Sequence, residues 1–233
     1  MFSDELRASA APVLRAVLDH PFWNGLRAGT LPGAALTRFV EQDTGHLLPC
    51  YGRAFAHCAA TAGDTGTALL LSRCAAETVD SAARLREALA ALAPRLGVPP
   101  PAADGVAAHP VTRAQCSAVT AAAAASWAAG LGALLPFMVF HLEVCTDLGA
   151  HCAPGSRYRP WVEVHRPGEP VRAAVRAVLA AVDAYAAGAG AGAARRAEVG
   201  EWYLRGARYE FAFASAVLAA GSDPDRTVRP SVP

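Results

Sequence analysis

The chain lacks the features that mark several large classes of protein. It has 233 residues and a formal net charge of +1, and its 21 basic residues, almost all arginine, are spread along its length. It contains no basic stripe and no recognisable nucleic-acid-binding module, so we expect no nucleic-acid partner. The amino terminus has no basic-then-apolar segment of the kind that directs secretion. These absences predict a cytoplasmic protein.

Long hydrophobic runs are also missing. The longest Ala-rich stretch, Thr120 to Leu135, is interrupted by Ser126, Trp127 and Gly130. It is shorter than the roughly 20 apolar residues that a membrane span requires. The stretch therefore predicts a buried helix, and we expect no membrane partner.

Cysteine is present without the spacing of a metal or redox motif. The six cysteines are Cys50, Cys58, Cys74, Cys116, Cys145 and Cys152. None forms a C-x-x-C pair, and no zinc-like pairing is visible. In a chain without a secretion signal, such cysteines are expected to be reduced thiols packed in the core.

Helical periodicity dominates what is present. The sequence is 53% hydrophobic, with no strand-like alternation and no 30-to-50-residue repeat. The expected long helices are 3–19, 34–62 with a kink at Pro49, 65–92, 112–130, a helix that begins or kinks in 131–136 and runs to 150, 169–187 and 193–220. A Pro-rich loop is expected over 94–110, a short segment over 158–165 and a flexible Gly-rich connector over 188–192. The prediction is an all-α, single-domain bundle of about seven long helices over residues 1–221, followed by a flexible tail over 222–233.

One segment of the second long helix combines charge with apolar surroundings. Asp43 and His46 lie three residues apart, and positions three or four apart share a face of an α-helix. Cys50 continues this line, while Phe39 and Leu47 would bury the segment. A carboxylate and an imidazole in an apolar interior need partners or a ligand to offset the cost of burial. The pattern indicates a functional site, with a satisfied buried hydrogen bond as the alternative.

Several phrases along the chain resemble the TenA / thiaminase II family, which has the heme-oxygenase-like all-helical fold. They are His20-Pro21-Phe22, Gly29-Thr30-Leu31-Pro32, Phe39-Val40-Glu41-Gln42-Asp43, Ala133-Leu134-Leu135-Pro136 and Arg208-Tyr209-Glu210-Phe211, in that order. The resemblance covers about residues 3 to 220. It implies an enzyme of thiamin salvage that hydrolyses aminopyrimidines or cleaves thiamin, and a homo-oligomer, either a dimer or a tetramer.

The resemblance assigns catalytic roles to two carboxyl residues of this chain but supplies no residue for the role of nucleophile. It implies that Asp43 orients the substrate and that Glu210 handles protons. The family places a catalytic Cys after the Leu-Pro pair, where this chain has Phe137, a side chain that cannot act as a nucleophile. Cys50 and Cys145 are conceivable substitutes, with packing in the core as the alternative for each.

Histidines stand where the family commonly has pocket tyrosines. By the resemblance, His46, His141 and His165 would face the pocket. The same resemblance places Phe39, Phe137 and Tyr209 beside the substrate. The three histidines with Asp43 and Glu210 would form the ligand set of one iron, manganese or zinc ion. The alternative is that each histidine is a hydrogen-bonding wall for a different substrate.

Three functions follow from these observations. The preferred one is a cofactor-free TenA-like hydrolase that acts on a small heteroaromatic or amine metabolite, with Asp43, Glu210 and His46 as catalytic residues and water replacing the thiol. The second is a mononuclear metal-dependent oxidase or lyase of specialised metabolism built on the histidine cluster. The third is a non-catalytic binder of a pyrimidine-like ligand.

Overall fold

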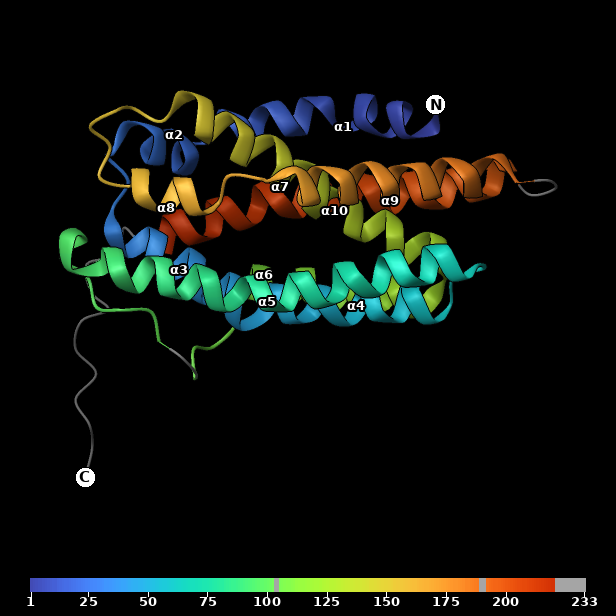
Figure 1. The fold of residues 1–233 in the computed structure, drawn as a ribbon, viewed down its shortest axis with the longest axis horizontal. Coiled ribbons are helices and arrows are strands. Elements are labelled where there is room, and N and C mark those ends of the chain that lie inside the picture. The colour runs from blue at the N-terminus through green and yellow to red at the C-terminus, as the bar shows by residue number, and fades with distance from the viewer. Residues whose placement is uncertain (103–104, 189–191, 221–233) are drawn as a thin grey trace.

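The computed structural model describes residues 1–102, 105–188 and 192–220, and these residues are helical with no strand among them (Figure 1). The elements are α1 (Phe2–Leu18), α2 (Pro21–Ala28), α3 (Gly33–Gln42), the π-helical turn η1 (Asp43–Leu47), α4 (Leu48–Ala60), α5 (Thr65–Leu96), α6 (Pro110–Ala125), α7 (Trp127–His151), α8 (Arg159–Val164), α9 (Glu169–Ala187) and α10 (Gly192–Ala220). The predicted all-α fold class is confirmed. The predicted flexible connector and tail fall largely or wholly outside the described residues.

Local chemistry sets where the helices begin and end. His20 and His109 each precede a proline, and the Nδ1 atom of each accepts a hydrogen bond from the backbone amide two residues later. Proline fits the first position of a helix because its missing N–H would have no partner there. Gly29 and Gly97 end α2 and α5 in the left-handed conformation, at φ of 80° and 66°.

Three predicted boundaries differ from the structure. The helix predicted over 112–130 ends at residue 125, because Ser126 is extended and its Oγ accepts a hydrogen bond from the amide of Ala129 at 2.9 Å, starting α7. Pro136 then lies inside α7 and does not begin a new helix. The loop predicted from Pro94 begins later, because α5 continues to Leu96.

The helix predicted over 34–62 is interrupted by one π-helical turn at Asp43–Leu47. The amide of Leu48 donates to the carbonyl of Asp43, five residues back. The hydroxyl of Thr44 donates to the carbonyl of Val40 at 2.7 Å, and Arg86 Nε donates to the same hydroxyl at 2.7 Å. Such turns insert an extra residue and rotate the following side chains relative to an α-helix.

The helices form two layers, and α7 crosses between them. Figure 1 shows α5 with α4 and α6 along one side, α1, α9 and α10 along the other, and α7 running obliquely from the first side to the second. Among the described residues, α7 is the one helix long and apolar enough to cross a membrane, but 72% of its most apolar window is buried inside the bundle. It is therefore the core helix of this fold, as the sequence predicted for its first part.

Two glycines allow α7 and α10 to cross closely. A Cβ on Gly132 would lie 2.7 Å from the Val199 carbonyl oxygen, and one on Gly206 would lie 2.9 Å from that of Ala133. Backbone atoms cannot move aside as a flexible side chain can, so both positions require glycine. This crossing fixes the two helices that carry Phe137, His141 and Glu210.

The crossing gives a prediction for stability. We expect Gly132→Ala to lower the free energy of unfolding by about 1–3 kcal/mol, because the added methyl group overpacks the helix contact. The matched control is Gly200→Ala on α10, where the nearest atom to an added Cβ is Leu6 Cδ2 at 3.8 Å. The control should be neutral or stabilising, since alanine favours a helix over glycine. Urea denaturation measures both, and equal effects would contradict the close crossing.

Candidate active site

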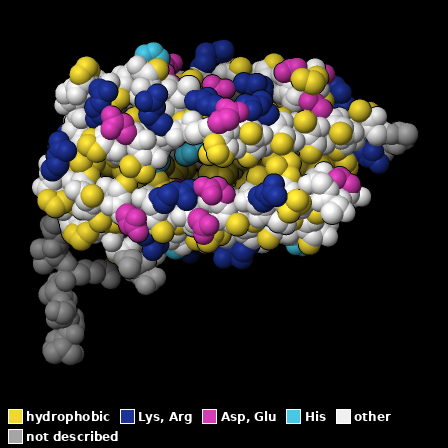
Figure 2. Space-filling view, in the orientation of Figure 1, with side chains coloured by type: hydrophobic (Ala, Val, Ile, Leu, Met, Phe, Trp, Pro, Cys, Tyr) yellow, Lys and Arg dark blue, Asp and Glu magenta, His cyan; other side chains and the backbone are white. Residues whose placement is uncertain are grey.

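A cavity of about 230 Å³ lies between the two layers and opens between α5 and the α8–α9 segment. Figure 2 shows this opening as a hollow lined by hydrophobic side chains, with a histidine visible inside it. Its aromatic lining residues are Trp23, Phe39, Tyr51, Phe137, Phe140, Trp161 and Phe213. Arg84 and Arg166 also line it. A small apolar cavity with a few polar groups is typical of a site for a small, flat organic molecule.

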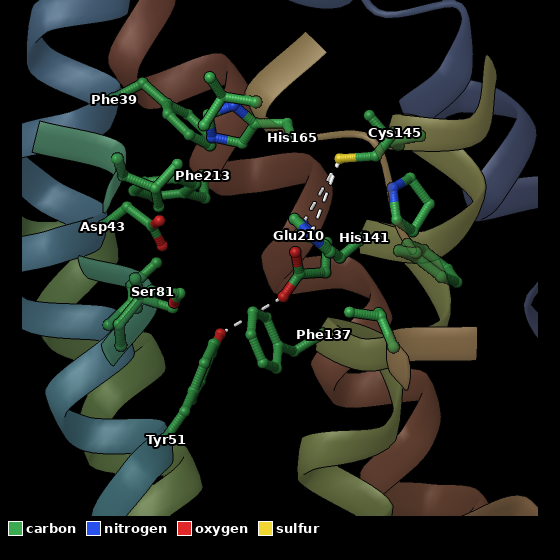
Figure 3. Close-up of a pocket in the computed structure, with 18 of the residues that line it drawn as sticks. Phe39, Asp43, Tyr51, Ser81, Phe137, His141, Cys145, His165, Glu210 and Phe213 are labelled. Carbon is green, nitrogen blue, oxygen red and sulfur yellow. Dashed lines mark hydrogen bonds between the residues drawn. The ribbon is translucent and has the colours of Figure 1, made fainter. Parts of the chain in front are cut away.

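Two carboxyl groups face this cavity from different helices. Asp43 comes from η1 and Glu210 from α10, and Figure 3 shows them converging from opposite sides. Burial, reinforced by the nearby charge of Glu210, raises the pKa of Asp43 to about 8. Burial raises the pKa of Glu210 to about 7, although two hydrogen bonds oppose this shift. Near neutral pH the pair therefore holds about one proton, as expected for two like charges in a poorly solvated site.

Glu210 is positioned by Tyr51 and Gln115. The Tyr51 hydroxyl donates to Glu210 Oε1 at 3.3 Å, and Gln115 Nε2 donates to the same oxygen at 3.1 Å (Figure 3 shows the Tyr51 contact). Gln115 Nε2 also donates to the Tyr51 hydroxyl at 2.6 Å. Gln115 is 2% exposed, so the network has little freedom to rearrange. Such donors stabilise the ionised form of Glu210 and lower its pKa.

Three residues of α7 face the cavity at intervals of four. Phe137 packs against Tyr51, with ring centroids 4.5 Å apart. His141 lines the cavity and is accessible through it, and desolvation by the surrounding protein lowers the pKa of its imidazole. The Cys145 sulfur lies 3.7 Å from His141 Nδ1, and burial raises the pKa of the Cys145 thiol to about 12. The thiol therefore stays protonated and the imidazole neutral near pH 7.

His165 closes one end of the cavity. Its ring stacks on Trp161 with centroids 3.5 Å apart, and its Nδ1 donates to the Trp161 carbonyl at 2.7 Å. Burial lowers the pKa of His165 to about 3, so this imidazole is neutral. The residue lies at the end of the short segment that the resemblance placed over the pocket.

Three residues singled out in the sequence do not face the cavity. His46 Nε2 instead contacts the Val106 carbonyl at 2.9 Å, on the loop before α6. Cys50 lies between α4 and α6, and Tyr209 is half-buried outside the lining. The prediction that Asp43, His46 and Cys50 share one face was wrong because it assumed α-helical spacing through the π-helical turn.

The predicted metal-ligand set is not assembled. His141, His165, Asp43 and Glu210 line the cavity, whereas His46 points away from it. Within the described parts of the chain, no group of three or more His, Cys, Asp or Glu side chains could hold a metal ion. The geometry of the donors therefore gives no support to the metal-dependent alternative.

Sequence reasoning missed Tyr51 and Gln115. Both are polar side chains on mainly apolar helices, and each is at most 2% exposed in the structure. A buried polar group on an otherwise apolar helix face is the signal that could have identified them, since such groups need a specific partner. Their common partner, Glu210, lies far away in the sequence.

A family model described as the TENA/THI-4/PQQC family matches residues 7–218. The chain belongs to this family. The resemblance seen in the sequence phrases is thereby confirmed, and it covers nearly the whole chain.

Solved structures of family members share the fold. A TenA homologue from P. horikoshii OT3 has a TM-score of 0.77 at 23% identity, covering 94% of this chain and 99% of that one. A protein described as a TenA family transcription regulator from Silicibacter sp. has a TM-score of 0.76 at 23% identity, covering 94% and 96%. A protein described as a proposed TenA-like thiaminase from Sulfolobus solfataricus has a TM-score of 0.68 at 16% identity, covering 93% and 95%. No curated protein sequence matches the chain.

Proposed function

We propose that this family member is an enzyme that hydrolyses a carbon–nitrogen bond of a small aminopyrimidine-like molecule by acid–base catalysis. The observation that carries the proposal is the pair of carboxyl groups in one aromatic-lined cavity, Asp43 and Glu210, with pKa values raised to about 8 and about 7. Raised carboxyl pKa values close to the working pH are typical of acid–base catalysts. The Sulfolobus relative described as a proposed TenA-like thiaminase is consistent with this class of reaction.

Asp43 would bind and activate the heterocycle. With its pKa at about 8, Asp43 is mainly protonated at pH 7 and can donate a hydrogen bond to a ring nitrogen. This bond withdraws electron density from the ring and from the carbon that carries the amine. The aromatic walls formed by Phe39, Phe137 and Phe213 would hold the flat ring.

Glu210 would transfer the protons of the reaction. In its ionised form, Glu210 takes a proton from a water molecule as the water oxygen bonds to the carbon that carries the amine. The carbon–nitrogen bond breaks, its electron pair stays on nitrogen, and the nitrogen takes the proton from Glu210. One water is consumed and one amine is released, without any external electron carrier. Tyr51 and Gln115 keep the carboxylate in place during the transfer.

Water is the nucleophile in this proposal because the cavity offers no activated side chain. Phe137 stands at the position of the family's thiol and has no nucleophilic atom. The Cys145 thiol reaches the cavity, but its pKa of about 12 leaves almost no thiolate near neutral pH. His46, which the sequence suggested as a third catalytic residue, lies outside the cavity and has no role in this mechanism.

A substrate panel tests the proposal. We expect an aminopyrimidine such as 4-amino-5-aminomethyl-2-methylpyrimidine to release ammonia, with a kcat/KM profile that peaks between pH about 7 and about 8. The active form has Glu210 ionised and Asp43 protonated, so the two limbs of the profile report the two apparent pKa values of this coupled pair. Ammonia release and calorimetric binding are measured together. Tight binding without turnover would favour the non-catalytic binder, and neither binding nor turnover would reject this substrate class.

A further inference from the structure

Two cysteines, Cys50 on α4 and Cys116 on α6, face each other's helix at the interface beside the active-site cavity. Cys50 Sγ donates to the Cys116 carbonyl at 3.5 Å and lies 3.6 Å from Thr120 Oγ1. Cys116 Sγ donates to the His46 carbonyl at 3.6 Å, one turn before Cys50 on the neighbouring segment, so each thiol contacts the backbone beside the other. Sixty-six residues separate them in the sequence, so only the fold brings them together.

The pair has the character of a reactive dithiol. The neighbouring Cys116 thiol lowers the pKa of Cys50, with smaller contributions from Thr120 and the charge of Arg53. The neighbouring Cys50 thiol, together with burial, raises the pKa of Cys116. Burial alone raises the pKa of Cys58, which lies two turns further along α4, to about 12. A thiolate beside a second thiol is the arrangement that favours disulfide formation.

Each of the two cysteines is the sequence neighbour of a residue that hydrogen-bonds to Glu210. Cys50 precedes Tyr51, and Cys116 follows Gln115. Tyr51 and Gln115 are the two donors to Glu210 Oε1. A covalent bond between Cys50 and Cys116 would therefore act on the backbone directly beside both donors.

We propose that Cys50 and Cys116 are a reversible redox-modification site, in which a hydroperoxide forms a disulfide that disrupts the hydrogen bonds to Glu210. Cys116 is partly exposed and Cys50 is 4% exposed, so a reagent as small as hydrogen peroxide suits the site. The Cys50 thiolate attacks one peroxide oxygen, the O–O bond breaks, and with a proton a sulfenic acid and one water are formed. The Cys116 sulfur then attacks the sulfenic sulfur, the S–O bond breaks, and a second water leaves. The two thiols lose two electrons, and the peroxide gains them.

The disulfide would affect the active site by shortening the distance between the Cys50 and Cys116 sulfur atoms. Bonded sulfurs lie about 2.05 Å apart, much closer than two sulfur atoms that are not bonded can approach. Closing this distance draws α4 toward α6 and rotates Tyr51 and Gln115 at the same time. Because their hydrogen bonds lower the pKa of Glu210, weakening them raises this pKa and favours the protonated carboxyl group.

The first test detects the bond itself and does not depend on the proposed reaction. Mild treatment of the full chain with hydrogen peroxide should reduce the thiols titrated after unfolding from six to four, since one disulfide removes two. Peptide mass mapping under non-reducing conditions should join the Cys50 and Cys116 peptides, and dithiothreitol should separate them. Cys116→Ser should prevent the link. Cys152→Ser, a control at another partly exposed cysteine, should leave it intact. A link between other cysteines, or none, would overturn the proposal.

The second test reads the effect on Glu210 without any substrate. At pH 8, the oxidised-minus-reduced infrared difference spectrum should show a new C=O stretching band of a protonated carboxylic acid. The band should be absent in Glu210→Gln, which separates Glu210 from Asp43, and absent in Cys116→Ser. An unchanged carboxyl region in a protein that does form the disulfide would overturn the coupling to the site. Failure of the substrate panel would leave both measurements unaffected.

Discussion

Glu210→Gln is expected to lower kcat/KM for an aminopyrimidine substrate by about 10²–10⁴-fold, the range that one general acid–base group contributes. Glutamine keeps the size of the side chain and can still hydrogen-bond with Tyr51 and Gln115, but it cannot take a proton from water or give it to the leaving amine. Substrate binding should change by no more than about tenfold, because only one hydrogen-bonding group is altered. Stopped-flow or steady-state ammonia release measures the rate, and calorimetry measures the affinity.

The matched control for this experiment is Glu201→Gln. Glu201 lies on the same helix, α10, but it is exposed and pairs with Arg205 at 3.4 Å. Its substitution should leave kcat/KM unchanged. If Glu210→Gln retained wild-type kcat, the carboxyl group would not transfer protons and the proposed mechanism would be wrong. An equal loss in both variants would indicate a change in folding and not in chemistry.

Asp43→Asn is expected to stabilise the protein at pH 9 and to have a much smaller effect at pH 5. Burial raises the pKa of Asp43 from 3.8 to about 8 in the folded protein. The folded chain thus retains a proton that the unfolded chain releases above pH 4, so unfolding becomes easier as the pH rises from about 4 to about 8. Asparagine carries no charge and removes this penalty. We expect a gain on the order of 3 kcal/mol at pH 9 relative to pH 5, less than full burial would give, since the cavity admits water.

Urea denaturation at the two pH values measures this difference. Asp80→Asn, at an exposed position on α5, is the control and should show no comparable gain at pH 9. The same Asp43→Asn variant should lose activity, because an amide is a far weaker acid than a protonated carboxyl group and polarises the ring nitrogen much less. A stability difference between wild type and Asp43→Asn that did not vary with pH would show that Asp43 is ionised throughout and would remove it as the acid.

Much of the fold and part of the site could be predicted from the amino-acid sequence. The apolar periodicity predicted an all-α bundle, because the spacing of buried residues on a helix is a local property of the sequence. The motif phrases predicted Asp43 and Glu210, and the structure brings these two together in one cavity with Phe39, Phe137, His141 and His165. Their individual roles stay predictions until the variants are measured.

The remaining features of the site were decided by tertiary structure. The sequence alone determined that this chain is helical, that Phe137 follows the Leu135-Pro136 pair, and that two carboxyl groups stand in recognisable phrases. The direction of His46, which points away from the cavity, could be known only from the folded structure. A single π-helical turn at Asp43–Leu47 changes the helix face on which the later residues lie. Only the folded chain joined Tyr51 and Gln115 to Glu210. Hydrogen bonds between residues 95 or 159 positions apart depend on how whole helices pack, and no local pattern encodes that packing.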